Sequence, residues 1–472
     1  MSIENTGARL IVEALEQNGC ERVFCVPGES YLALLDALRD SKIAVTVCRQ
    51  EGGATMAAEA WGKLTGKPGV AMVTRGPGAT NASSGIHVGR QDSTPMILFV
   101  GQVGRAMRGR EAFQEIDFRR MYGEMAKWIE EIDSADRVPE FVSRAFYTAT
   151  SGRPGPVVLA LPEDMLRETT TVATPKPWVQ VETHPGLTQM AELQKMLWRA
   201  ERPFVIAAGS RWSEAAVAGL RRFAERFKLP VGCSLRRQGL FDNTHPNYAG
   251  DVGIGINPAL AARVKQADLL LLIGGRMSEM PSSGYTLIDI PEPQQTLVHV
   301  HPGAEELGRL YRPTLAINAS PTAFVASLEG LQPPKTIPWE GAADEAHAAY
   351  LAWSTPGQNP GPVQLGEIVG WLRERLPADA IITSGAGNYS VWVHRFYRHR
   401  RFGSQIAPTS GSMGYGLPAA LAGKLKHPER IVVCFAGDGD FQMTLQEFIT
   451  ANETGANLIV IVVNNGIHGT IR

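Results

Sequence analysis

The sequence has almost no net charge and no long apolar run. Its 472 residues carry 46 Lys and Arg against 47 Asp and Glu, so the net charge at pH 7 is −1. A chain this neutral has no general attraction to nucleic acid or to an anionic membrane surface. No uninterrupted apolar stretch of about 18 residues occurs, so we predict no transmembrane helix. We also recognise no signal peptide at the N-terminus.

Cysteines are few, and none is arranged in a pair. There are 5 in the whole chain, an odd number, and no Cys-x-x-Cys motif occurs. Disulfide scaffolds and structural zinc sites need paired spacing, so neither is favoured. We therefore expect reduced, buried thiols in a cytoplasmic protein. With 44% hydrophobic and 20% charged residues, the composition is typical of a soluble protein with a sizeable core and excludes wholesale disorder.

Short apolar runs alternate with helical stretches throughout the sequence. At about 150 residues per domain, the length suggests about three domains. We place them at residues 1–170, 186–335 and 360–472. The alternation predicts an α/β fold of three consecutive doubly wound, mostly parallel-sheet domains. The last block ends within this alternation, so we expect the C-terminal part of the third domain to be missing.

The expected elements have clear sequence signals. Thr6 is the expected N-cap of a first helix, because apolar residues follow it at helical spacing. Segment 169–183, rich in Pro and Thr, and segment 332–362, rich in Pro, Gly and Ala, are predicted to be linkers. The expected strands are Val23–Val26, Ala44–Cys48, Val70–Val73, Met96–Val100, Val157–Leu161, Phe204–Ala207, Leu269–Ile273, Leu297–Val300, Ala380–Thr383, Ile431–Phe435 and Leu458–Val463.

Polar residues follow two consecutive apolar strands near the C-terminal end. Asp438 lies between Gly437 and Gly439 after the strand Ile431–Phe435, and Asn465 follows the strand Leu458–Val463. A helix expected over 443–453 separates the strands, and a right-handed crossover makes them parallel. Both polar side chains then emerge at the carboxyl edge of one sheet, where α/β folds bind ligands.

The residue types at this edge favour a hard cation. Carboxylate and amide oxygens suit Mg²⁺ or Ca²⁺ rather than zinc, and two protein ligands leave positions open for phosphate oxygens. Gly437 and Gly439 allow close approach of the backbone, and the following helix adds its dipole. The sequence thus predicts a metal-bridged diphosphate. The alternative is an ordinary β-α-β turn with an Asp cap and an Asn-Gly turn.

A second candidate site lies near the N-terminus. Glu51 follows the strand Ala44–Cys48 and precedes a Gly pair and an Ala-rich helix. A carboxylate at a strand end, facing an apolar helix, is well placed for burial, and such a group can exchange a proton near neutral pH. The alternative is a glutamate that interacts with the dipole of the following helix.

These motifs resemble those of a known family. Gly437-Asp438-Gly439 with Asn464-Asn465 resembles the signature of thiamin diphosphate enzymes, as does the segment Ser410–Ala420. Arg49-Gln50-Glu51 resembles the motif that carries the catalytic glutamate of these enzymes. Further similar segments are Val26-Pro27-Gly28, Val73–Asn81, Gly101–Val103 and Ala112–Glu115. These forms are most similar to the acetolactate synthase (acetohydroxyacid synthase) large subunit, and the resemblance covers nearly the whole chain.

The resemblance implies roles for individual residues. Glu51 would be catalytic and would hydrogen-bond the pyrimidine ring of thiamin diphosphate. Mg²⁺ would be bound by Asp438, Asn465 and the carbonyl group of Ile467. Cofactor contacts would come from Pro27, Glu51, Asn388, Gly411, Met413, Gly437, Asp438, Gly439, Asp440 and Asn465. The substrate pocket would include Gly28, Phe113, Gln114 and Lys127.

The resemblance also implies a reaction. We expect decarboxylation of a 2-oxo acid such as pyruvate and carboligation to a second carbonyl compound, as in branched-chain amino acid biosynthesis. A homodimer or homotetramer is expected, with active sites between subunits and no nucleic acid or membrane partner. FAD binding stays open, because Met277-Ser278-Glu279 and His299-Val300-His301 depart from the family pattern. Glu29, where these synthases often have Gly, leaves the substrate open.

Other functions remain possible at this point. Within the superfamily, the chain could be a lyase or decarboxylase for 2-hydroxyacyl-CoA, oxalyl-CoA or an aromatic acyloin. Outside it, the chain could be a non-catalytic homologue or a Rossmann-type dehydrogenase. The dehydrogenase needs a Gly-rich fingerprint after a strand, and Gly250–Gly255, which we predict to be a loop, is only weakly similar. The His299 and His301 pair is expected on a polar strand face, with a metal as the alternative.

Overall fold

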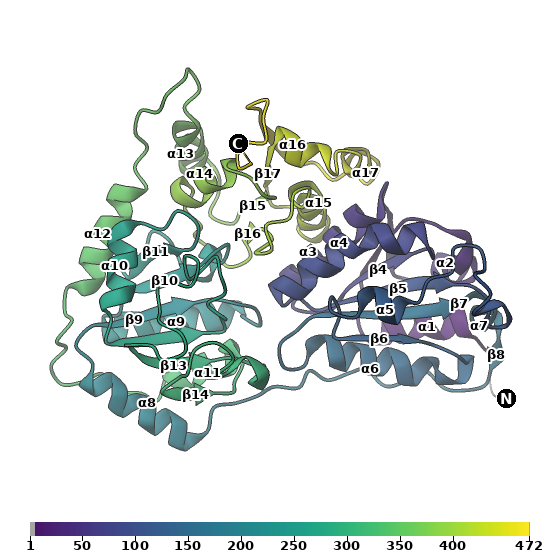
Figure 1. Ribbon diagram of the computed structural model, residues 1–472, viewed down its shortest axis with the longest axis horizontal. Helices are drawn as coiled ribbons and strands as arrows, with labels where there is room; N and C mark the ends of the chain where they lie inside the picture. Colours follow the sequence, from purple (N-terminus) through teal and green to yellow (C-terminus); the bar gives the residue numbers. More distant parts are fainter. Residues whose placement is uncertain (1–4, 472) are drawn as a thin grey trace. The chain divides into compact units, whose positions relative to one another are not determined.

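The structure, a computed structural model, describes residues 5–471, so Met1 and Arg472, the ends of the first and last predicted domains, lie outside it. Three parallel α/β sheets confirm the predicted fold class (Figure 1). The chain divides into two compact units. The first unit contains residues up to 181 with 383–386 and 408–466, and the second contains 182–382, 387–407 and the residues from 467.

The first sheet has six strands in the order β3-β2-β4-β5-β7-β6. They are β2 (Arg22–Cys25), β3 (Ala44–Val47), β4 (Gly69–Val73), β5 (Met96–Gln102), β6 (Trp128–Glu131) and β7 (Pro156–Pro162). All neighbouring pairs are parallel. The five expected strands are present within two residues at each end. The strand β6 was not predicted, because its half-buried Trp-Ile-Glu-Glu sequence at a sheet edge has no apolar run.

Helices cover both faces of this sheet (Figure 1). Helices α1 (Gly7–Gln17) and α6 (Val138–Thr150) pack on one face, where Val23 and Cys25 of β2 point. Helices α3 (Glu51–Thr65) and α4 (Pro77–Asp92) lie on the other face, where Phe24 contacts Trp61 with ring centroids 6.0 Å apart. Short elements complete this part: β1 (Asn5–Thr6), α2 (Leu32–Arg39), α5 (Phe118–Tyr122), α7 (Glu163–Arg167) and β8 (Thr169–Thr170).

The start of α1 shows why the local sequence forms a helix there. The hydroxyl of Thr6 accepts the N–H of Arg9 at 3.3 Å, so the predicted N-cap is confirmed. The cap satisfies one of the backbone donors that have no partner within the helix. Leu10, Ile11 and Leu15 then bury one side of the helix against the sheet.

The second sheet is also parallel and has the order β11-β10-β9-β12-β13-β14. Its strands are β9 (Pro203–Ala207), β10 (Val231–Ser234), β11 (Tyr248–Val252), β12 (Leu269–Ile273), β13 (Thr296–Val300) and β14 (Leu315–Ile317). Helices α8 (Leu187–Arg199), α9 (Glu214–Phe227) and α11 (Pro321–Leu328) contribute to the core on one face. Helix α10 (Pro258–Gln266) contributes to the core on the other face, and α12 (Ala342–Trp353) contributes to both, with Tyr350 in the first core and Ala346 in the second.

Two predictions about this unit were wrong. The segment Gly250–Gly255 is not a loop throughout, because residues 250–252 belong to β11, an edge strand whose buried run contains Gly and Asp. The predicted linker 332–362 contains helix α12. We took its Ala-rich composition as a linker signal, whereas Ala has the highest intrinsic helix propensity.

The third sheet has the order β16-β15-β17-β18, with β15 (Ile381–Ser384), β16 (Gln405–Ile406), β17 (Val432–Gly437) and β18 (Ile459–Val463). Its helices are α13 (Leu365–Arg375), α14 (Tyr389–Phe396), α15 (Gly416–Lys426), α16 (Asp438–Gln442) and α17 (Glu447–Glu453). The single helix expected over 443–453 is replaced by α16 and α17. Of the helices in residues 5–471, none has the length and apolar character needed to cross a bilayer.

Candidate active site

The ends of β17 and β18 bring the segments that carry two of the predicted metal ligands, Asp438 and Asn465, to one edge. The strands are parallel, and Gly437 lies opposite Val463. Asp438 and Asn464 are the next residues, so both leave adjacent strands at the same edge, as predicted. Asp438 is half-buried and begins α16. Asn464 and Asn465 are exposed in a turn in which the N–H of Gly466 donates to Oδ1 of Asn464 at 3.0 Å.

Asp440 has a different position from Asp438. Its carboxylate is buried and accepts the N–H of Gly414 at 2.5 Å. The hydroxyl of Thr444 donates to the carbonyl of Gly414 at 2.6 Å. Gly414 has φ +80°, and a Cβ there would lie 2.8 Å from the Cβ of Met443. Asp440 therefore holds the backbone of the segment that carries Met413.

The segment before Gly414 forms an accessible turn. Gly411 is exposed with φ +68°, a conformation that L side chains rarely adopt. Met413 is half-exposed, and the hydroxyls of Ser410 and Ser412 lie 3.0 Å apart. The Gly411 carbonyl and the Met413 side chain are thus not enclosed by the core of this unit.

Glu51 begins α3 and faces α4. Its Oε2 accepts the side-chain N–H of Asn81 at 3.0 Å. A Cβ on Gly78 would lie 3.3 Å from Oε1 of Glu51, so the glycine leaves open the space beside this carboxylate. The carbonyl of the Gln50 side chain accepts the N–H of Gly53 at 3.0 Å and caps the helix. We did not single out Asn81 from the sequence, although it lies within the Val73–Asn81 motif.

Glu447 is a buried acid beside Glu51 that the sequence analysis missed. Its carboxylate accepts the N–H groups of Arg49 at 3.1 Å and Gln50 at 3.0 Å. The hydroxyl of Thr450 donates to the same carboxylate at 2.7 Å. Burial raises the pKa of Glu447, while these hydrogen bonds lower it in part. Its only signal in the sequence was a polar residue within an expected amphipathic helix.

A buried arginine joins the loops that carry the predicted substrate residues. Nε of Arg75 donates to the carbonyl of Phe113 at 3.1 Å, and its NH1 donates to Glu163 at 3.2 Å. NH2 of Arg75 also lies 3.6 Å from Glu29. The Phe113 side chain itself is 71% exposed. Arg75 therefore fixes this loop while its aromatic side chain stays accessible.

Two glycines set the spacing of the same loops. A Cβ on Gly28 would lie 2.4 Å from the Cβ of Thr74, and one on Gly76 would lie 2.6 Å from the Cβ of Gln114. Gln114 itself has φ +65°. Pro27 is exposed beside Gly28. The structure thus brings Pro27, Gly28, Phe113 and Gln114 to the carboxyl edge of the first sheet, the edge at which Glu51 follows β3.

Lys127 does not lie at this edge, so the structure does not support it as a substrate residue. It immediately precedes β6, at the amino edge of the same parallel sheet. Its ammonium donates to the carbonyls of Thr148 at 2.5 Å and Ser151 at 2.7 Å, at the end of α6. Basic side chains are favourable at helix C-termini. Lys127 therefore stabilises that helix end.

Two predicted ligands belong to the second unit. Asn388 is exposed at the start of α14. The residue Ile467 is exposed, and its carbonyl accepts the N–H of Gly469 at 3.0 Å. His299 in β13 and His301 just after it are buried, so the expected polar strand face was wrong, and Nε2 of His299 bonds the carbonyl of Gly275 at 2.8 Å. His301 accepts the N–H of Gly303 at 3.0 Å, so both rings make local backbone contacts.

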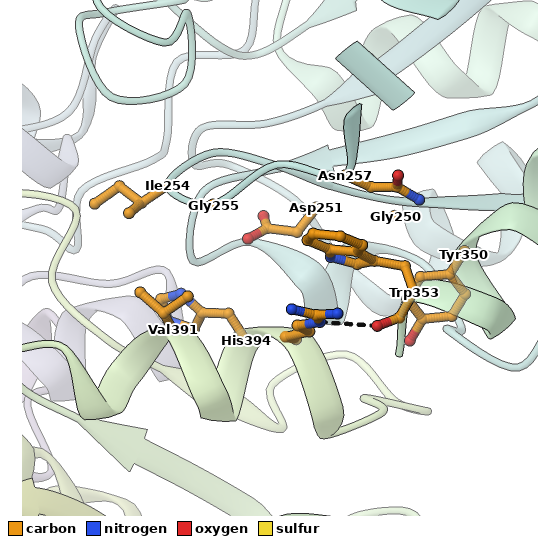
Figure 2. Close-up of a pocket in the computed structure, with 10 residues that line it drawn as sticks. Gly250, Asp251, Ile254, Gly255, Asn257, Tyr350, Trp353, Val391 and His394 are labelled. Carbon is orange, nitrogen blue, oxygen red and sulfur yellow. Dashed lines mark hydrogen bonds between the residues drawn. The ribbon is translucent and has the colours of Figure 1, made fainter. Parts of the chain in front are cut away.

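The second unit also contains a pocket of ≈ 350 Å³, including its open mouth. Figure 2 shows it between the loop after β11, helix α12 and helix α14. Burial raises the pKa of Asp251 to about 7, although the charge of Arg236 opposes this. Within residues 5–471, Oδ1 of Asp251 and both ring nitrogens of His394 have no hydrogen-bond partner.

Comparisons with known proteins agree with this geometry. The N-terminal TPP binding domain of thiamine pyrophosphate enzymes matches residues 5–121, the central domain 190–328 and the C-terminal TPP binding domain 385–472. The chain is 30% identical to acetolactate synthase isozyme 2 large subunit of Escherichia coli, over 99% of this chain and 84% of that protein.

Two further relatives show the same relationship. The chain is 31% identical to the acetolactate synthase large subunit of Lactococcus lactis, over 99% of this chain and 82% of the relative. It is also 31% identical to acetolactate synthase large subunit IlvB1 of Mycobacterium tuberculosis, over 99% of this chain and 77% of the relative. With both the domain matches and the full-length similarity, this chain belongs to the thiamine pyrophosphate enzymes of the acetolactate synthase large-subunit type.

Proposed function

We propose that this protein is a thiamin diphosphate- and Mg²⁺-dependent enzyme that decarboxylates a 2-oxo acid such as pyruvate. It then joins the two-carbon unit to a second carbonyl compound, giving 2-acetolactate when that compound is pyruvate. The observation that carries the proposal is the edge shared by Asp438 and Asn464-Asn465 on two adjacent parallel strands.

The residues at this edge fit a diphosphate with its cation. Asp438 supplies an anionic oxygen and Asn465 a neutral amide oxygen, which are ligands of the kind that Mg²⁺ prefers. The carbonyl of Ile467 is the third proposed ligand. Gly437 and Gly439 leave room for phosphate oxygens, and Asn388 is the proposed contact from α14. Thiamin diphosphate would supply a thiazolium that accepts the electron pair released by loss of CO₂.

The cofactor ring would be held by two segments, the turn at Gly411 from one subunit and the start of α3 from another. The exposed turn at Gly411 offers a backbone carbonyl, and Met413 offers an accessible apolar side chain. Glu51 would donate or accept a proton at the pyrimidine ring. Asn81 holds its carboxylate by the 3.0 Å hydrogen bond, so the rotamer is set before the cofactor binds.

The substrate would enter beside the loops that Arg75 joins. Gly28, Phe113 and Gln114 lie on these loops, and Phe113 supplies an exposed aromatic surface. Arg75 is close to two carboxylates, Glu29 and Glu163, so its charge is largely compensated. We therefore assign Arg75 to loop positioning and Phe113 with Gln114 to substrate contact. FAD is not part of the proposal, because Met277-Ser278-Glu279 and His299-Val300-His301 depart from the family pattern.

We propose that the enzyme is a homodimer or homotetramer with active sites between subunits. This assembly follows from the family relationship. It would let Glu51 of one subunit serve cofactor held by Asp438 of another. Cytoplasmic location and a role in branched-chain amino acid biosynthesis are proposed on the same ground.

The experiment is product analysis. The full chain is incubated with thiamin diphosphate, Mg²⁺ and pyruvate, and both CO₂ and 2-acetolactate are measured. The proposal expects one CO₂ per acetolactate, because two pyruvates lose one carboxyl group. CO₂ accompanied only by acetaldehyde would indicate a simple decarboxylase. Absence of CO₂ release would favour a lyase for 2-hydroxyacyl-CoA, oxalyl-CoA or an aromatic acyloin.

A further inference from the structure

A buried cluster of charged residues lies on helices α3 and α4 and contacts the segment 409–415, which is proposed to hold the cofactor. It consists of Glu59 and Lys63 on α3 and Asp92, the last residue of α4, and we call it the acid–lysine cluster. The ammonium of Lys63 lies 3.1 Å from Oε1 of Glu59 and also contacts Asp92. The side chains of both acids are 0% exposed and that of Lys63 is 9% exposed.

Helix stability alone does not explain this cluster. Burying charged groups is costly, and a carboxylate at a helix C-terminus, as at Asp92, opposes the helix dipole. The cluster also contains two carboxylates and one ammonium, so its charges do not balance. Burial raises the pKa of Glu59, the charge of Lys63 lowers it and that of Asp92 raises it. Because burying these charged groups is unfavourable, the cluster needs hydrogen-bond partners that stabilise it.

Several of those partners belong to the segment proposed to hold the cofactor. The carboxylate of Asp92 accepts the backbone N–H of Thr409 at 2.9 Å and its hydroxyl at 2.6 Å. The hydroxyl of Tyr415 donates to Oε2 of Glu59 at 2.5 Å. Lys63 donates to the Tyr415 hydroxyl at 3.2 Å, and its ammonium lies 4.7 Å from the centre of that ring.

The contacts hold both ends of a short exposed turn. Thr409 precedes the turn and Tyr415 follows it, while residues 410–413 between them are exposed or half-exposed. Gly414 is held separately by Asp440 and Thr444. The chain from Gly411 to Met413 is therefore fixed at each end but open along its length. The charged residues that contact its ends lie on α3, the helix that Glu51 begins, and on α4, the helix that carries Asn81.

We propose that the acid–lysine cluster positions the turn 410–413 for the pyrimidine ring of the cofactor, with Glu59, Asp92 and Tyr415 acting as positioning residues. This inference rests on the proposed function. Helix α3 would thus present Glu51, its first residue, to the cofactor of a neighbouring subunit. From Glu59 and Lys63, two and three turns further along, it would fix the turn that holds the cofactor of its own subunit. The spacing of four residues between Glu51, Thr55, Glu59 and Lys63 keeps them near one face of α3.

Two substitutions separate positioning from ordinary stability. Tyr415→Phe removes the hydroxyl that reaches Glu59 from the cofactor segment but keeps the ring beside Lys63. Thr94→Val removes a hydroxyl that donates to Oε1 of the same Glu59 at 2.5 Å, from the loop between α4 and β5. Each variant thus removes one donor to one buried carboxylate. Thr409→Val, which removes a donor to Asp92, is the second variant if Tyr415→Phe fails to fold.

Two measurements are made on the full chain. The first is backbone hydrogen exchange of residues 410–415 without cofactor, and the second is the dissociation constant of thiamin diphosphate with Mg²⁺. We expect Tyr415→Phe to speed exchange in the turn and weaken cofactor binding roughly ten-fold, the effect of losing a hydrogen bond to a charged group. We expect Thr94→Val to lower the Tm but to leave both quantities within two-fold of wild type.

The outcomes distinguish failure of the positioning role from failure of the proposed function. Unchanged exchange in the turn of Tyr415→Phe, or equal effects of both variants, would overturn the positioning role. If the wild-type chain fails to bind thiamin diphosphate, the proposed function is wrong. The exchange measurement then still decides whether the cluster positions the turn.

Discussion

The carboxylate of Glu447 accepts the backbone N–H of Gln50 at 3.0 Å, although 397 positions separate the two residues in the sequence. It also accepts the N–H of Arg49. These donors immediately precede Glu51, at the end of α3 where helix N–H groups have no partner within the helix. Glu447 therefore satisfies buried donors and fixes the start of the helix that presents the proposed catalytic acid.

Replacing Glu447 by Ala should lower the free energy of unfolding by about 1–3 kcal/mol, because two backbone donors lose their buried acceptor. Glu447→Gln keeps an acceptor oxygen and should recover part of this loss. Urea unfolding of both variants measures the difference. Equal stability of Glu447→Ala and wild type would show that these hydrogen bonds contribute nothing net.

Glu51→Gln should retain thiamin diphosphate but lose activity by about 10²–10⁴-fold, since a proton donor and acceptor is replaced by an amide of the same shape. Cofactor binding and CO₂ release from pyruvate are measured on the same preparation. Glu13→Gln, a change on the polar side of α1, serves as the control and should leave both unchanged. Full activity of Glu51→Gln would remove Glu51 from the mechanism.

Asp251 should make stability depend on pH. Burial raises its pKa to about 7, so the folded chain keeps a proton that the unfolded chain releases at lower pH. The free energy of unfolding therefore falls as the pH rises from about 4 through 7. The amide of Asp251→Asn does not titrate. The free energy of unfolding of this variant should therefore rise, relative to that of wild type, by on the order of 2–4 kcal/mol between pH 4 and pH 8.

Denaturant unfolding followed by tryptophan fluorescence measures this change, because Trp353 lines the same pocket. The comparison is the stability difference between variant and wild type at each pH. A constant difference from pH 4 to pH 8 would mean that Asp251 titrates as it does in the unfolded chain.

Local patterns predicted the elements that local forces determine. The inner strands β4, β5 and β7 of the first sheet are short apolar runs buried on both faces, and Thr6 caps α1 through its own hydroxyl. The shared edge of Asp438 and Asn464 followed from the handedness of a β-α-β crossover, and the pairing of Gly437 with Val463 confirms it. These features depend on residues close together in the sequence.

Features that depend on distant contacts could not be predicted. Glu447 looks like an ordinary helix residue, and Tyr415 like one more residue of the motif Ser410–Ala420, until folding brings them to Gln50 and Glu59. Lys127 looked like a free cation, and only the end of α6 explains its position. The roles of the site residues remain predictions, because they depend on a cofactor and on a neighbouring subunit.

The most direct test of the central claim is thiamin diphosphate binding by wild type and Asp438→Asn, with Mg²⁺ and with Mg²⁺ removed by chelation. We predict tight binding only for wild type with Mg²⁺, and a loss of about 10–100-fold in affinity for the variant, because a charged ligand of the bridging cation is gone. Binding by wild type that is insensitive to Mg²⁺, or equal affinity of the variant, would contradict a metal-bridged diphosphate at the edge of β17 and β18.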